Sequence, residues 1–160
     1  MIETKPLSPK SVPAWRFIQI LSKSLYLLIP VGYLVAGFWI DLPEIDPFLF
    51  WGMTVVLVFY WIFSVFFLPK IRYKHWQYGV NEHEIELQSG IVIRRKTLIP
   101  LSRVQHVDTR QGPIFRQYDL ANVMIFTAAG SHSIPALDEI VAEELRKQIS
   151  AYAQLATEDV

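Results

Sequence analysis

The chain has 160 residues, of which 52% are hydrophobic, and its 15 basic side chains balance 15 acidic ones. Soluble domains are typically about 45–50% apolar, and here the apolar residues are concentrated in two long uncharged stretches, so the composition excludes a purely soluble or disordered chain. Zero net charge disfavours bulk attraction to nucleic acid, and we expect no nucleic-acid partner. The absence of cysteine excludes disulfides, thiolate zinc sites and cysteine nucleophiles.

The two apolar stretches predict helices that cross a membrane. Residues 48–68 are 21 residues without a formal charge, which as a helix extend about 31 Å and match a hydrocarbon core of about 30 Å. Residues 24–40 are 17 residues, at the lower limit for a span. The ammonium of Lys23 can reach the interface and let residues 17–21 extend this helix. The link at residues 41–47 holds two prolines and three carboxylates, which stop helices and are costly in lipid.

The charges that flank this transmembrane hairpin, residues 24–68, predict its orientation. Cations lie outside both spans, whereas the link carries only carboxylates. The cations are Lys5, Lys10, Arg16 and Lys23 before the first span and Lys70, Arg72 and Lys74 after the second. Because positively charged flanks are retained in the cytoplasm, we expect residues 1–23 and 70–160 on the cytoplasmic side.

From about Arg72 the apolar periodicity changes to that of short strands. A tight turn is predicted at Ser89-Gly90, and residues 111–113 interrupt the pattern again. The predicted strands cover residues 77–80, 84–88, 91–99, 104–110 and 120–127, with a short segment through residues 134–137. Several short strands in succession predict an antiparallel sheet or a partial barrel.

The last element is predicted to be a helix, because apolar residues recur at spacings of three and four. They are Val141, Leu145, Ile149, Tyr152 and Ala156. Asp138 can cap this helix, and Glu143 with Lys147 forms an i,i+4 pair. We therefore expect a β-domain capped by a C-terminal helix over residues 72–156, followed by a tail at 157–160.

The order of these features resembles a known family. The features are the hairpin, Tyr78-Gly79-Val80, the turn at Gly90, the basic run Arg94-Arg95-Lys96, the run from Ile99 to Asp108, Gly112-Pro113-Ile114-Phe115-Arg116 and the final helix. In this order they are similar to the bacterial pleckstrin-homology-like (PH-like) membrane proteins of the YdbS type. The resemblance implies a membrane-anchored α+β fold in the bacterial inner membrane, with a strongly bent antiparallel sheet closed at one end by the C-terminal helix. It supplies no catalytic residues.

One position departs from the pattern of this family. Asp119-Leu120-Ala121 stands where the family usually has Gly-Leu-Ala. Aspartate tolerates a left-handed backbone better than most residues, so we expect the turn to be kept.

The sequence predicts no catalytic, cofactor or metal site. None of the histidines forms an i,i+4 pair or an HExxH arrangement; they are His75, His83, His106 and His132. The chain also lacks a Gly-x-Ser-x-Gly elbow and a glycine-rich phosphate loop. We therefore expect a protein that is not an enzyme.

The basic run Arg94, Arg95 and Lys96 is the most specific candidate for a binding site. On an ideal strand Arg94 and Lys96 would share one face and Arg95 would lie on the other. A structural interpretation is that these charges protect a sheet edge from pairing. A functional one is that they contact anionic headgroups or an acidic partner. With Arg103 they form the candidate contact set.

In the absence of a catalytic motif, we expect the PH-like domain to act as a scaffold for membrane or cytoplasmic proteins. From Asn81 onward acidic residues outnumber basic ones by three, so we do not expect the domain as a whole to adhere to anionic lipid. The alternative is a sensor of anionic lipid headgroups, and a third possibility is a small transporter subunit, for which the second span offers little beyond Thr54 and Ser64. Gly32 and Ala36, four residues apart, suggest a homo-oligomer.

Overall fold

A computed structural model of the chain describes residues 4–40, 45–91 and 93–158. The chain folds into two compact units, one of which is made of two separate stretches of the sequence. Residues 15–69 form one unit, which we call the helical unit. Residues 1–14 and 70–160 form the other, which we call the β-domain.

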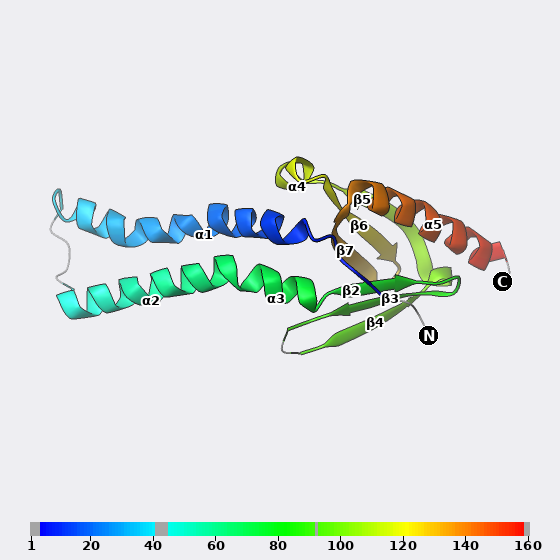
Figure 1. The fold of residues 1–160 in the computed structure, drawn as a ribbon, viewed down its shortest axis with the longest axis horizontal. Helices are drawn as coiled ribbons and strands as arrows, with labels where there is room; N and C mark the ends of the chain where they lie inside the picture. Colours follow the sequence, from blue (N-terminus) through cyan, green and yellow to red (C-terminus); the bar gives the residue numbers. More distant parts are fainter. Residues whose placement is uncertain (1–3, 41–44, 92, 159–160) are drawn as a thin grey trace. The chain divides into compact units, whose positions relative to one another are not determined.

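Two long helices form most of the helical unit, and both are long and apolar enough to cross a membrane. Helix α1 covers Ser11–Ala36 and helix α2 covers Pro47–Phe66, and the short helix α3, Leu68–Lys74, follows (Figure 1). Helix α1 thus begins well before residue 24, where the sequence placed the start of the first span. Within the link, residues 41–44 lie outside the described part of the chain.

A cluster of polar side chains explains how α1 can include the charged residue Lys23. The ammonium of Lys23 donates to the hydroxyl oxygens of Tyr60, at 3.0 Å, and Ser64, at 2.6 Å, both on α2. The same ammonium lies 4.6 Å from the centre of the Tyr60 ring. Because these contacts come from the facing helix, Lys23 is accommodated inside the hairpin and helps to join its two helices.

The start of α2 is determined locally by the end of the link. The carboxylate of Asp46 accepts hydrogen bonds from the backbone N–H groups of Phe48, at 2.8 Å, and Leu49, at 3.2 Å. Pro47 occupies the first turn, where its missing N–H has no cost. Asp46 and Pro47 therefore start α2 as predicted, whereas α1 has already ended at Ala36, before the link.

Most of the large apolar side chains of the helical unit are exposed in the isolated chain. Phe48 is 87% exposed, Phe59 73% and Leu25 65%. A Cβ placed on Gly32 would meet nothing within 4 Å, so this glycine does not serve a close contact with α2. An apolar surface of this extent requires lipid around it.

The first sheet of the β-domain has four antiparallel strands in the order β1-β2-β3-β4. They cover Lys5–Pro6, Gln77–Val80, Glu84–Ser89 and Arg95–Pro100. The second sheet has three antiparallel strands in the order β5-β6-β7. They cover Val104–Arg110, Leu120–Thr127 and Gly130–Asp138. The short helices η1, Leu101–Arg103, and α4, Pro113–Gln117, connect them.

The predicted antiparallel sheet capped by a C-terminal helix is confirmed. Helix α5 covers Glu139–Glu158 and packs on the second sheet (Figure 1). It buries Leu145 and Ile149 of the predicted stripe together with Ala142, whereas Val141, which the sequence placed in that stripe, is 40% exposed. The barrel is not closed, because in the described residues the two sheets share no paired strands.

Strand β4 begins later than the sequence suggested. A tight turn at Ser89-Gly90 followed by a strand from residue 91 was predicted, but Ser89 pairs with Arg95. The connection between β3 and β4 is therefore longer than a tight turn, and residues 90, 91, 93 and 94 lie outside the strands. The prediction failed because isoleucine has a high strand propensity, although Ile91 and Ile93 are not in a strand.

Two of the described residues other than glycine have a left-handed backbone, one in the turn before β6 and one within β7. Asp119 has φ 52°, so the expected left-handed turn is kept. Ala136 has φ 53° at an irregularity in the β6–β7 pairing. Its N–H donates to the side-chain carbonyl of Asn122 at 2.9 Å, and its carbonyl accepts from the backbone N–H of Ser8 at 3.3 Å. These bonds hold a conformation that costs alanine about 1–2 kcal/mol.

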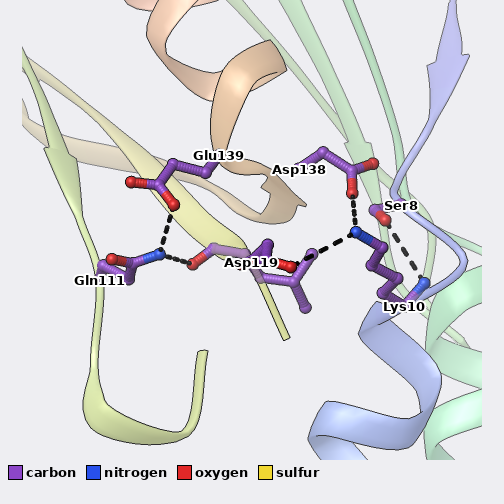
Figure 2. Close-up of polar contacts among 7 residues, drawn as sticks. Ser8, Lys10, Gln111, Asp119, Asp138 and Glu139 are labelled. Atoms are coloured by element: carbon purple, nitrogen blue, oxygen red, sulfur yellow. Dashed lines mark hydrogen bonds and ion pairs between the residues drawn. The ribbon is translucent and has the colours of Figure 1, made fainter. Parts of the chain in front are cut away.

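The N-terminal segment belongs to the β-domain. Strand β1 pairs with β2, with Lys5 opposite Tyr78, and Leu7 is only 2% exposed. The ammonium of Lys10 lies 3.2 Å from the carboxylate of Asp138 and 4.0 Å from that of Asp119 (Figure 2). The sequence analysis treated residues 1–23 as a separate segment, whereas residues before the first helix contribute a strand and a core side chain to the domain.

Candidate functional site

A basic groove lies at one end of the first sheet. It has a cavity volume of about 530 Å³ and is formed by the end of α3, the adjacent β2 and β3 residues, and the β3–β4 loop. Its cationic lining residues are Lys74, Arg94, Arg95 and Lys96, and its other polar side chains include His75, Gln77, Gln88 and Ser89. Among the described residues that line it, none is a carboxylate.

Gly90 gives the β3–β4 loop the shape that forms this groove. Its φ is 118°, a conformation that residues with a side chain rarely adopt. A Cβ at this position would overlap with the backbone carbonyl of Ile93. The β3–β4 connection therefore needs glycine at this position.

The later start of β4 corrects the expected separation of the three cations. Arg94 precedes the strand, so strand alternation does not apply to it. Arg94, Arg95 and Lys96 are all exposed and line the same groove. The sequence argument for a split cluster therefore fails for Arg94, because it assumed an extended backbone from residue 91 onward, whereas Arg95 and Lys96 are consecutive residues of β4 as expected.

Lys96 differs from its neighbours because its charge is compensated. Its ammonium lies 2.9 Å from the carboxylate of Glu86, whose side chain is only 7% exposed. The amide of Gln88 also donates to this carboxylate. The hydrogen bond from Gln88, followed by the hydrogen bond and charge of Lys96, lowers the pKa of Glu86 below its ordinary value of 4.5. Lys96 thus neutralises a nearly buried carboxylate from the edge of the groove.

The other three cations have no such partner. Within the described residues, no ion pair involves Lys74, Arg94 or Arg95. The groove therefore presents three uncompensated positive charges. Two of them are guanidinium groups, each of which can donate two parallel hydrogen bonds to the oxygens of one phosphate or carboxylate.

Arg103, the fourth residue of the predicted set, lies elsewhere. It ends η1, beyond the opposite end of β4, and does not line the groove. Conversely, the sequence analysis used Lys74 only as a topology signal. A cation soon after an apolar span could have been considered a headgroup contact, but its proximity to Arg94 depends on strand pairing and could not be derived from spacing.

A second groove runs beside β5. It has a cavity volume of about 500 Å³ and is lined by residues 104–107 of β5 together with Ser150, Ala153 and Gln154 of α5. Strand β5 is at the edge of its sheet and pairs with β6 on one side only. This groove carries no cluster of like charges.

Comparison with known proteins identifies relatives of the whole chain. A family model described as the bacterial PH domain matches residues 26–153. The chain is 41% identical over 158 residues to the UPF0699 transmembrane protein YdbS of Bacillus subtilis (strain 168), covering 96% of this chain and 95% of that relative. No solved structure gives a significant match.

Proposed function

Because the chain belongs to the bacterial PH domain family and has two helices able to cross a membrane, we propose that it is a two-span protein of the bacterial inner membrane with both termini in the cytoplasm. Its β-domain binds anionic lipid headgroups in the basic groove. The protein-interaction scaffold favoured by the sequence becomes the second candidate.

The gathering of uncompensated cations carries this proposal. Lys74, Arg94 and Arg95 line one cavity of about 530 Å³ without a lining carboxylate, although basic and acidic residues nearly balance in the β-domain as a whole. Cations used only to protect a sheet edge need no shared cavity. A phosphate group supplies the charge and the oxygen acceptors that paired guanidinium groups bind.

The chain itself keeps the groove close to the bilayer. Lys74 follows Leu68, the end of the predicted second span, by six residues. Even fully extended, six residues reach only about 20 Å, and a bilayer adds a headgroup layer of several ångströms beyond its hydrocarbon core. The groove is therefore within reach of the membrane that holds the spans.

The pairing of β1 with β2 supports the two-span arrangement. Lys5 precedes the first long helix and Tyr78 follows the second, and the two residues are paired in one sheet. This pairing favours an even number of crossings, because two crossings bring both ends of the hairpin to the same side of the membrane. The excess of flanking cations favours the cytoplasmic side.

Native mass spectrometry of the full chain, in an equimolar mixture of phosphatidylglycerol and phosphatidylcholine, tests the headgroup proposal. We expect wild type to retain phosphatidylglycerol preferentially. Each basic residue near anionic lipid contributes about 1 kcal/mol, so R94Q/R95Q should lower this preference by roughly 30-fold. Lys96 is left in place because its removal would leave Glu86 without its ammonium partner.

The matched control is R103Q/R116Q, which also removes two exposed arginines from the β-domain but leaves the groove unchanged. This variant should keep the wild-type lipid preference. Equal preferences in the two double variants would contradict the proposal, because net charge alone would then explain any effect.

The scaffold remains a candidate because of the groove beside β5. An edge strand has unpaired backbone groups on one side, and an extended peptide can add to it as a further strand. The groove between β5 and α5 offers room for its side chains. A protein partner bound in this way would contact Ser150, which provides a separate position for crosslinking.

A further inference from the structure

The β3–β4 loop exposes apolar side chains directly before the arginines of the basic groove. Ile93 is 75% exposed and Ile91 44%; Val92, between them, lies outside the described residues. Turns in water are dominated by glycine, proline, asparagine, aspartate and serine. Two exposed branched apolar residues at a turn are therefore unusual for a surface that faces water, and they fit an apolar environment outside the β-domain.

We propose that this loop inserts Ile91 and Ile93 into the interfacial layer of the membrane, beside the lipids whose headgroups meet Arg94 and Arg95. The occupant of this apolar surface is thus the bilayer that holds the spans. The part played by the arginines rests on the proposed function, whereas the insertion of the isoleucines rests on their exposure.

The order of residues along the loop matches the layers of a membrane surface. Apolar side chains at an interface enter the boundary between headgroups and acyl chains, about 5–10 Å deep. Cations remain at the level of the phosphates. Here two exposed isoleucines come first and two uncompensated arginines follow at once, so one loop can satisfy both layers.

Gly90 shapes the start of this loop. Its φ is 118°, and the carbonyl of Ile93 lies where a Cβ of residue 90 would be. Ile93 directly precedes Arg94, which lines the groove, so an exposed isoleucine and the cations of the groove are neighbours in the chain.

A fluorescent label that senses membrane depth tests the insertion in the full chain. The chain has no cysteine, so I93C carries the only label after reconstitution into phosphatidylcholine–phosphatidylglycerol vesicles. Lipids with a nitroxide near the headgroup should quench this label several-fold more than a label on I140C. Ile140 is the matched control, because it is also an isoleucine with 75% exposure in the β-domain.

The results separate insertion from headgroup binding. Strong quenching at residue 93 in pure phosphatidylcholine supports insertion even if R94Q/R95Q leaves the phosphatidylglycerol preference unchanged, in which case only the headgroup proposal fails. Equal quenching at residues 93 and 140 overturns insertion, even if the lipid preference depends on the arginines. The same measurement with I91C guards against a local effect of the first substitution.

Discussion

At the scale of single residues, Glu86 and Lys96 determine how the basic groove can be tested. Glu86 lies on β3 with little exposure, and Lys96 on β4 covers its carboxylate. A carboxylate in this position is costly unless its charge is met. Lys96 therefore contributes to the fold, while Arg94 and Arg95 are available for ligands.

This division predicts a pH effect. The pKa of Glu86 is lowered in the folded domain, so its stabilising contribution is present above the ordinary value of 4.5 and is lost as the pH falls through the lowered pKa. Lys96→Gln removes one cause of that lowering. Acid unfolding, followed by circular dichroism of the full chain in neutral detergent, should then begin at a higher pH.

The control for this experiment is Lys147→Gln. Lys147 also pairs with a carboxylate, that of Glu143 at 3.8 Å, but both side chains are exposed. Exposed pairs contribute little, so the midpoint of acid unfolding should barely move. Similar shifts in the two variants would mean that Lys96 has no special structural role.

The residue scale also shows what the sequence can and cannot predict about the site. The cationic residues Arg94, Arg95 and Lys96 were identified as candidates because they are adjacent in the sequence. Their common groove was not, because it depends on a left-handed Gly90 and on the register that pairs Ser89 with Arg95. The left-handed Asp119 was predictable, since a family pattern with glycine marks such positions, whereas nothing in the sequence singled out Ala136.

At the scale of elements, strands with a clear alternation were predicted well and short or interrupted ones were not. Strands β5 and β6 have the predicted bounds, 104–110 and 120–127. The two-residue strand β1 was missed, because Lys5 and Pro6 carry no strand signal and their partner lies more than 70 positions away. Such long-range pairing is decided by tertiary contacts rather than local propensity.

The element scale gives a test of the N-terminal segment. Leu7 follows β1 and is 2% exposed, so Leu7→Ala should destabilise the β-domain by about 2–5 kcal/mol. Denaturant unfolding of the full chain in detergent measures this change. Leu155→Ala is the control, since Leu155 on α5 is 58% exposed and exposed substitutions usually change stability by less than about 0.5 kcal/mol.

A small effect of Leu7→Ala, equal to that of the control, would contradict the assignment of this segment to the domain. It would instead support the simpler expectation from the sequence, a separate segment before the first span. The comparison is informative because both substitutions remove the same atoms and differ only in burial.

At the scale of the whole molecule, the β-domain is assembled from both sides of the helical hairpin. Residues before α1 and residues after α2 contribute strands to one sheet. The domain therefore completes its fold only after both spans have been made, and it ties the two outer ends of the hairpin together.

The proposed topology makes a prediction for cysteine labelling. Ile45→Cys lies in the link between α1 and α2, and Glu82→Cys lies between β2 and β3. In spheroplasts or protoplasts, whose plasma membrane is intact, a membrane-impermeant maleimide should label residue 45. It should label residue 82 only after the cells are lysed. The reverse pattern would place the β-domain on the outer side.

The most direct test of the central claim is photo-crosslinking from within the basic groove in living bacterial membranes. Benzoylphenylalanine replaces Ser89, which lines that groove, and in a parallel strain it replaces Ser150, which lines the groove beside β5. Mass spectrometry then identifies each adduct. Headgroup binding predicts an anionic phospholipid on residue 89, lost in R94Q/R95Q and retained in R103Q/R116Q. A protein adduct on residue 89, or a lipid adduct indifferent to the arginines, would contradict it.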